Sequence, residues 1–190
     1  MPVQIGAHSH SFSDPTGLLS DCHRRIEMFL GTLERVASVI DRPLTNDTRP
    51  ALESALRYFR EAAPKHTADE EESLFPRLCQ LDLPDVEALI ERLELLEHDH
   101  IVAGSLHAEV EELGQLYLAT GSLEAAGVEA FRKAIASLVS IYKQHIGIED
   151  NQVFPLAERL LSSTDKLAIA NEMAARRKPR LVTSTSGFTE

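Results

Sequence analysis

The chain has 190 residues, of which 43% are hydrophobic and 26% charged, and its formal net charge at pH 7 is −11. This length and composition are typical of one globular domain with a sizeable core. The acidic balance argues against nucleic acid and against an anionic membrane surface as partners. No apolar run is long enough to span a bilayer, and the first 13 residues do not resemble a secretory signal. We therefore expect no membrane partner.

Cys22 and Cys79 are the two cysteines of the chain, and neither belongs to a C-x-x-C motif. This cysteine usage favours a reducing cytoplasm in which both side chains are free thiols. Cys22 is expected to be a buried structural thiol, because buried cysteine behaves as a small apolar residue.

The spacing of apolar residues predicts four long helical segments and a short fifth one. The first is predicted from about Pro15 to Ile40, with Asp14 as its cap and Pro15 in its first turn. The second begins after the capping residues 46–48 and continues to about Leu78. Within it, Pro64 is expected to kink or restart the helix, and Pro76 to mark a bend or the final turn.

The third segment is predicted from about Pro84 to Leu118, and the fourth from about Glu124 to Leu161. Pro155 occupies the same place in the fourth segment as Pro76 in the second. A short helix is expected after the capping run 162–165. From Arg176 the chain becomes basic and then rich in Ser and Thr, so we expect this part to be loose.

These segments predict an all-α fold: an up-down-up-down antiparallel four-helix bundle with a short C-terminal fifth helix and a loose tail. Residues 1–175 would form a single domain, and residues 176–190 a flexible tail. No segment shows the alternation that is typical of a strand.

One motif occurs twice, and its residues are typical metal ligands. It reads H-x-x-x-E-x-x-x-x-F-P, and the two copies run from His66 to Pro76 and from His145 to Pro155. Because four residues are slightly more than one helical turn, the His and the Glu of each copy share one face. Two such pairs facing each other across a bundle would make a two-metal site, with Glu70 and Glu149 as the carboxylates.

The repeat extends to the first and third segments. His23 and His100 each continue an apolar helical stripe, and apolar residues follow both at the same offsets. His98 competes with His100, but residues two apart point about 200° away from each other on a helix. We favour His100 because it continues the stripe that contains Leu93 and Leu96. The second half of the chain thus repeats the first: a histidine on the apolar face, then H-x-x-x-E.

The candidate ligands combine imidazole nitrogen and carboxylate oxygen. A closed zinc site with thiolates and an all-oxygen calcium or magnesium site are both excluded by this set. Nitrogen and oxygen together suit iron or manganese. Two six-coordinate ions would keep positions for solvent and for an exchangeable ligand such as O2, NO or peroxide. Burying these ionisable groups without a metal would be costly.

From about Asp14 to Leu161 the chain resembles a hemerythrin-like (HHE cation-binding) domain of bacterial type. The resemblance lies in Cys22-His23, the two H-x-x-x-E motifs with their Phe-Pro tails, and Asp99-His100. It implies a four-helix bundle that holds two Fe ions in an oxo- or hydroxo-bridged non-haem di-iron centre. By this resemblance the terminal ligands are His23, His66, His100 and His145, and the bridging ligands are Glu70 and Glu149. Asp150 is the alternative to Glu149.

The oxygen-carrying members of that family have a fifth histidine on the third helix. Here the positions four residues before and after His100 hold Leu96 and Gly104. One histidine fewer leaves a more open iron, which argues against simple reversible O2 storage and favours sensing, NO or peroxide chemistry, or iron handling. We expect a di-iron protein that binds a small ligand such as O2, NO or peroxide for sensing, storage or a stress response. The alternatives are a di-iron oxidoreductase that consumes peroxide or NO, with Tyr142 as a candidate acid, and an iron-storage or iron-handling protein.

Overall fold

The computed structural model describes residues 14–178, and all regular secondary structure in this range is helical. The helices are α1 (Pro15–Ala37), α2 (Thr48–Glu61), α3 (Ala63–Asp69), η1 (Glu70–Leu74), α4 (Phe75–Cys79), α5 (Val86–Thr120), α6 (Ala125–Ile148), η2 (Glu149–Val153), α7 (Phe154–Leu160) and α8 (Ser163–Arg176). The labels η1 and η2 denote single π-helical turns. The N-terminal 13 residues, for which we expected no secretory signal, and residues 179–190 lie outside the described range.

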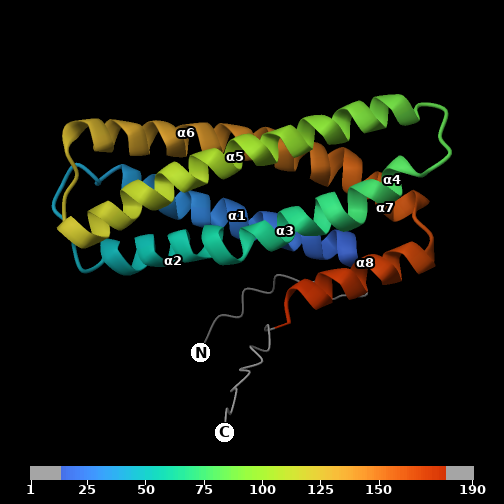
Figure 1. Ribbon diagram of the computed structural model, residues 1–190, viewed down its shortest axis with the longest axis horizontal. Helices are drawn as coiled ribbons and strands as arrows, with labels where there is room; N and C mark the ends of the chain where they lie inside the picture. Colours follow the sequence, from blue (N-terminus) through green and yellow to red (C-terminus); the bar gives the residue numbers. More distant parts are fainter. Residues whose placement is uncertain (1–13, 179–190) are drawn as a thin grey trace, which may run out of the picture.

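The long helices α1, α2, α5 and α6 lie side by side as a bundle (Figure 1). α1 packs against α2 and α6, and α5 packs against the same two helices. α8 lies against α1, α3 and η1, outside the four long helices. The all-α helical bundle is confirmed, whereas the up-down-up-down order of its helices stays a prediction. No helix within residues 14–178 is long and apolar enough to cross a lipid bilayer.

Local sequence signals mark several helix ends. The Asp14 carboxylate accepts a hydrogen bond from the Gly17 N–H (2.9 Å), and the Ser162 hydroxyl accepts one from Asp165 N–H (3.1 Å). Gly121 ends α5 with a φ of 80°, a left-handed conformation that glycine adopts without strain. The kink expected at Pro64 appears as a break at Ala62, between α2 and α3. α1 ends at Ala37, three residues before the predicted end at Ile40, and residues 38–41 form turns.

Each Phe-Pro tail follows a π-helical turn that begins at a glutamate. The Phe75 N–H donates to the carbonyl of Glu70, and the Phe154 N–H donates to the carbonyl of Glu149. The next residue is a proline, which has no N–H to continue the α-helical pattern. Such turns occur often at functional sites, because the extra residue redirects the side chains around it. The bends expected near the prolines therefore take the form of widened turns.

Two apolar clusters fill the bundle on either side of the candidate ligands. The boundary between them falls at a histidine on both α1 and α5. On α1, Leu19 belongs to one cluster and Ile26 to the other. On α5, Leu96 and Ala103 are divided in the same way. The candidate site is therefore a polar layer between two apolar clusters.

Candidate metal centre

The structure brings the six predicted ligands together from different helices. His23 comes from α1, His66 from α3, His100 from α5 and His145 from α6, while the two glutamates open the π turns. They form two overlapping groups that could hold metal ions: His23, His66, Glu70 and Glu149, and Glu70, His100, His145 and Glu149. Within each group the candidate ligand atoms lie within 4.8 Å of one another. Both glutamates belong to both groups.

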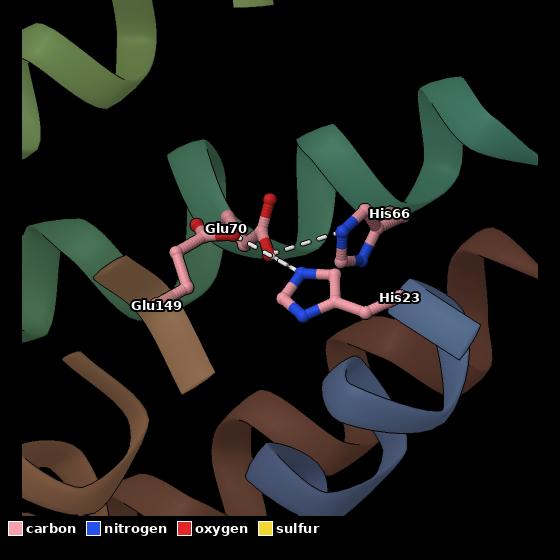
Figure 2. A group of neighbouring side chains, drawn as sticks. All are labelled: His23, His66, Glu70 and Glu149. Atoms are coloured by element: carbon pink, nitrogen blue, oxygen red, sulfur yellow. Dashed lines mark ion pairs between the residues drawn. The ribbon is translucent and has the colours of Figure 1, made fainter. Parts of the chain in front are cut away.

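The distances follow the repeat in the sequence. His66 Nε2 lies 3.2 Å from Glu70 Oε1, and His145 Nε2 lies 3.1 Å from Glu149 Oε2. Figure 2 shows His23 and His66 pointing toward Glu70 from neighbouring helices. His23 Nε2 also lies 3.0 Å from Glu149 Oε2. On the opposite side, His100 Nε2 lies 3.5 Å from Glu70 Oε2.

The atoms that face the centre are buried and lack hydrogen bonds. Glu70 and Glu149 are fully buried, and their four carboxylate oxygens find no hydrogen-bond partner among the described residues. The same holds for Nε2 of His23 and of His145. Leaving buried polar atoms unpaired is costly. A divalent cation would bind these nitrogen and oxygen atoms directly, so the residues present fit a metal.

The six groups also perturb one another's protonation. Burial opposes a charge on His23, but its hydrogen bond with Asp150 and the nearby carboxylates of the two glutamates raise its pKa to about 11. Burial, together with the nearby Glu149 carboxylate, raises the pKa of Glu70. Burial alone would raise the pKa of Glu149, yet its contacts with His145 and His23 hold that pKa below its usual range. Protons and a metal cation therefore compete for the same atoms.

In three of the four histidines, the outer ring nitrogen, Nδ1, which points away from the centre, contacts a carboxylate. Nδ1 of His23 lies 2.9 Å from Asp150, Nδ1 of His100 lies 2.8 Å from Glu71, and Nδ1 of His145 lies 3.4 Å from Asp99. Such contacts orient metal-binding imidazoles and make them more basic. Sequence reasoning named Asp99 and Asp150 without assigning them this role, and it did not single out Glu71. The available signal is that each acid adjoins a candidate ligand in the chain.

The alternatives named from the sequence lie elsewhere. His98 is exposed on the outside of α5. Asp150 contacts the outer nitrogen of His23, whereas Glu149 faces the centre. Gly104 is exposed and Leu96 is buried in the core. The Tyr142 hydroxyl lies 3.1 Å from Nε2 of His107, a contact that the sequence did not predict.

A further feature that sequence reasoning missed is a buried ion pair beside Glu70. Asp69 is fully buried, and its carboxylate accepts hydrogen bonds from Arg176 (2.9 Å) and from Arg177. α8 thus covers this side of the centre. Arg176 is the last residue of α8 and Arg177 follows it, although both were expected in the loose tail. The division of the chain at residue 176 is otherwise untested, because residues 179–190 are not described.

A helical bundle with two adjoining clusters of buried histidine and glutamate defines a class of cation-binding domain. Comparison with known families agrees with this class. The sequence profile of the family described as hemerythrin HHE cation binding domain matches residues 14–165. The chain therefore belongs to the hemerythrin HHE cation-binding family, which confirms the resemblance found in the sequence.

The chain is also similar to an uncharacterized protein of Haemophilus influenzae. The two are 25% identical over 170 residues, which covers 88% of this chain and 92% of the relative. The similarity therefore extends over nearly all of both proteins.

Proposed function

We propose that this protein holds a non-haem di-iron centre that binds a small ligand such as O2, NO or peroxide, in sensing, storage or a stress response. His23 and His66 would bind one iron, and His100 and His145 the other. Glu70 and Glu149 would bridge the two, in preference to Asp150. When bound, the iron pair would supply redox-active cations with an exchangeable position for the ligand.

The observation that carries this proposal is the set of unpaired buried atoms at the centre. Six atoms converge there with neither a hydrogen bond nor contact with water: two imidazole nitrogens and four carboxylate oxygens. A structural polar network would satisfy these atoms internally. Their arrangement in two groups that share both glutamates supports two metal ions rather than one.

The chain's own residues would prepare the site for the ions. Asp150, Glu71 and Asp99 orient three imidazoles through their outer nitrogens. The apolar clusters on either side limit the access of water. We also propose the up-down-up-down antiparallel order for the four long helices, because it brings the two repeated halves face to face across the bundle.

An oxidoreductase is the second candidate, but the structure lends it less support. Tyr142 was the candidate acid, and its hydroxyl is engaged with His107 rather than with the six ligands. Binding of a ligand therefore stands first. We place the protein in the cytoplasm because Cys22 and Cys79 are free thiols, and its acidity favours a small-molecule ligand over nucleic acid.

The test is the metal content of protein purified without oxygen, with an absorption spectrum before and after exposure to air or NO. We expect about two irons per chain and a spectral response to the ligand. His66→Ala and His145→Ala should each lose about one iron or more, because each removes a ligand that no neighbour replaces. His98→Ala is the matched control and should keep its iron, because His98 is exposed. Stoichiometric iron in the first two variants, or none in the natural protein, would contradict the proposal.

A further inference from the structure

The two halves of the repeated site differ on their outer sides. We propose that the two metal positions are unequal and that a divalent cation fills the His100/His145 position before the His23/His66 position. This inference rests on the proposed function, because it assumes that the six residues bind metal. It concerns the order of filling, which the repeat in the sequence does not predict.

Both imidazoles of the His100/His145 position are backed by a carboxylate. Nδ1 of His100 lies 2.8 Å from Glu71 Oε1, and Nδ1 of His145 lies 3.4 Å from Asp99 Oδ2. A carboxylate at Nδ1 leaves Nε2 free to bind the metal, fixes the plane of the ring and increases electron donation to the ion. Two negative charges just outside the ligands also stabilise a divalent cation directly.

The His23/His66 position has one such carboxylate, and its charge is shared. Asp150 lies 2.9 Å from Nδ1 of His23, but it also accepts hydrogen bonds from Arg24 and Ser20. Nδ1 of His66 is buried and finds no hydrogen-bond partner within residues 14–178. Nothing at that nitrogen selects the tautomer whose Nε2 is free for a metal.

The reason for this difference lies in two substitutions within the repeat. Asp99, which backs His145, immediately precedes His100; the residue that precedes His23 is Cys22, so a thiol occupies the place of a carboxylate. The second difference precedes the glutamates: Asp69 precedes Glu70, whereas Ile148 precedes Glu149, and the Asp69 carboxylate is paired with the arginines at the end of α8.

The expected difference in metal affinity can be judged from other metal sites in which a carboxylate contacts a metal-binding histidine. Removing such a partner typically weakens metal affinity by about 10- to 100-fold. We therefore expect the two positions to differ in affinity by about 10-fold or more. At one equivalent of metal, the His100/His145 position should hold most of the ions.

The experiment is an oxygen-free titration of the metal-free protein with Co2+, followed by calorimetry and by the visible absorption of the bound ion. Two separate steps are expected, with dissociation constants about 10-fold or more apart. His66→Ala should keep the tight step, whereas His145→Ala should lose it. Two steps of equal affinity, a second step tighter than the first, or loss of the tight step in His66→Ala would overturn the inference. If the folded natural protein bound no Co2+ at all, the proposed function itself would fail.

A matched pair of conservative variants tests the cause. Asp99→Asn should weaken the tight step about 10-fold and leave the weak step unchanged, while Asp150→Asn should weaken the weak step only. Each change keeps the shape of the side chain and removes its charge, and circular dichroism would verify that the helices remain. If Asp99→Asn left the tight step as it was, the outer carboxylates would not be the cause of the inequality.

Discussion

At the scale of single residues, the buried and half-buried histidines within residues 14–178 fall into two kinds. The four at the centre face carboxylates, whereas His107 stacks on Phe59 with ring centroids 4.3 Å apart and meets the Tyr142 hydroxyl at Nε2. Burial lowers the pKa of His107 to about 4, so its imidazole is neutral near pH 7. Burial also raises the pKa of Tyr142, which keeps its hydroxyl protonated and able to donate to His107.

This difference predicts how His107 affects stability as the pH falls. The pKa of an unfolded histidine is about 6.5, so between about pH 6.5 and pH 4 the unfolded chain takes up a proton that the folded protein does not. The free energy of unfolding should therefore decrease on that account by about 2 kcal/mol from pH 7 to pH 5. His107→Gln keeps an acceptor for Tyr142 but does not titrate, so it should lose correspondingly less stability. Urea unfolding of both proteins at the two pH values measures this, and equal losses would refute it.

At the scale of secondary structure, the π turns and α8 are the elements that shape the site. Each π turn begins at a candidate bridging glutamate, and the acid that follows the glutamate then reaches a histidine of the opposite half: Glu71 reaches His100, and Asp150 reaches His23. α8 breaks this symmetry, because it covers only the side on which Asp69 lies. A bundle without α8 would leave that carboxylate without its arginines.

We predict that Asp69→Asn loosens α8. Asp69 is fully buried and its arginines are 19% and 30% exposed, so loss of the pair should cost roughly 1–3 kcal/mol after allowance for solvent at the arginines. Urea unfolding gives the loss of stability, and limited proteolysis should cut within residues 163–178 more rapidly. Glu72→Gln is the control, because Glu72 pairs with the same Arg176 but is 67% exposed. The control should change stability by less than about 0.5 kcal/mol; equal effects of the two variants would show that burial of Asp69 is irrelevant.

At the scale of the whole molecule, a polar layer separates two apolar cores. The cores pack well without it, since Leu19, Leu33 and Leu96 are each fully buried. The layer itself contributes buried charges that repel one another, the two glutamates above all. The folded protein is therefore expected to be less stable without metal than with it, because a cation offsets that repulsion.

Metal removal should lower the thermal unfolding midpoint. A ligand at 100 times its dissociation constant stabilises the folded state by about 2.7 kcal/mol per site. For a domain of this size that corresponds to roughly 5–10 °C per occupied site. Calorimetric scans of the protein before and after treatment with a chelator measure the shift. The shift should be smaller in His145→Ala, and an unchanged midpoint in the natural protein would contradict metal binding within the core.

The sequence by itself determined the helical fold and the set of six candidate ligands. Both depend on regular spacing along a helix, and spacing is a local property: His66 and Glu70 share a face whatever packs against them. The duplicated motif adds the expectation that the two faces meet. The structure brings those six side chains together, while their role as ligands stays a proposal.

Only the tertiary structure decided which carboxylates contact the Nδ1 atoms of the histidines and which helix covers the centre. Glu71 and His100 come from different helices, as do Asp69 and the two arginines at the end of α8. Periodicity within one helix carries no information about such pairs, and Arg176 and Arg177 resemble a solvated tail when read alone. The absence of a partner at Nδ1 of His66 belongs to the same group of findings. It depends on how distant segments pack around that nitrogen, which periodicity along one helix does not specify.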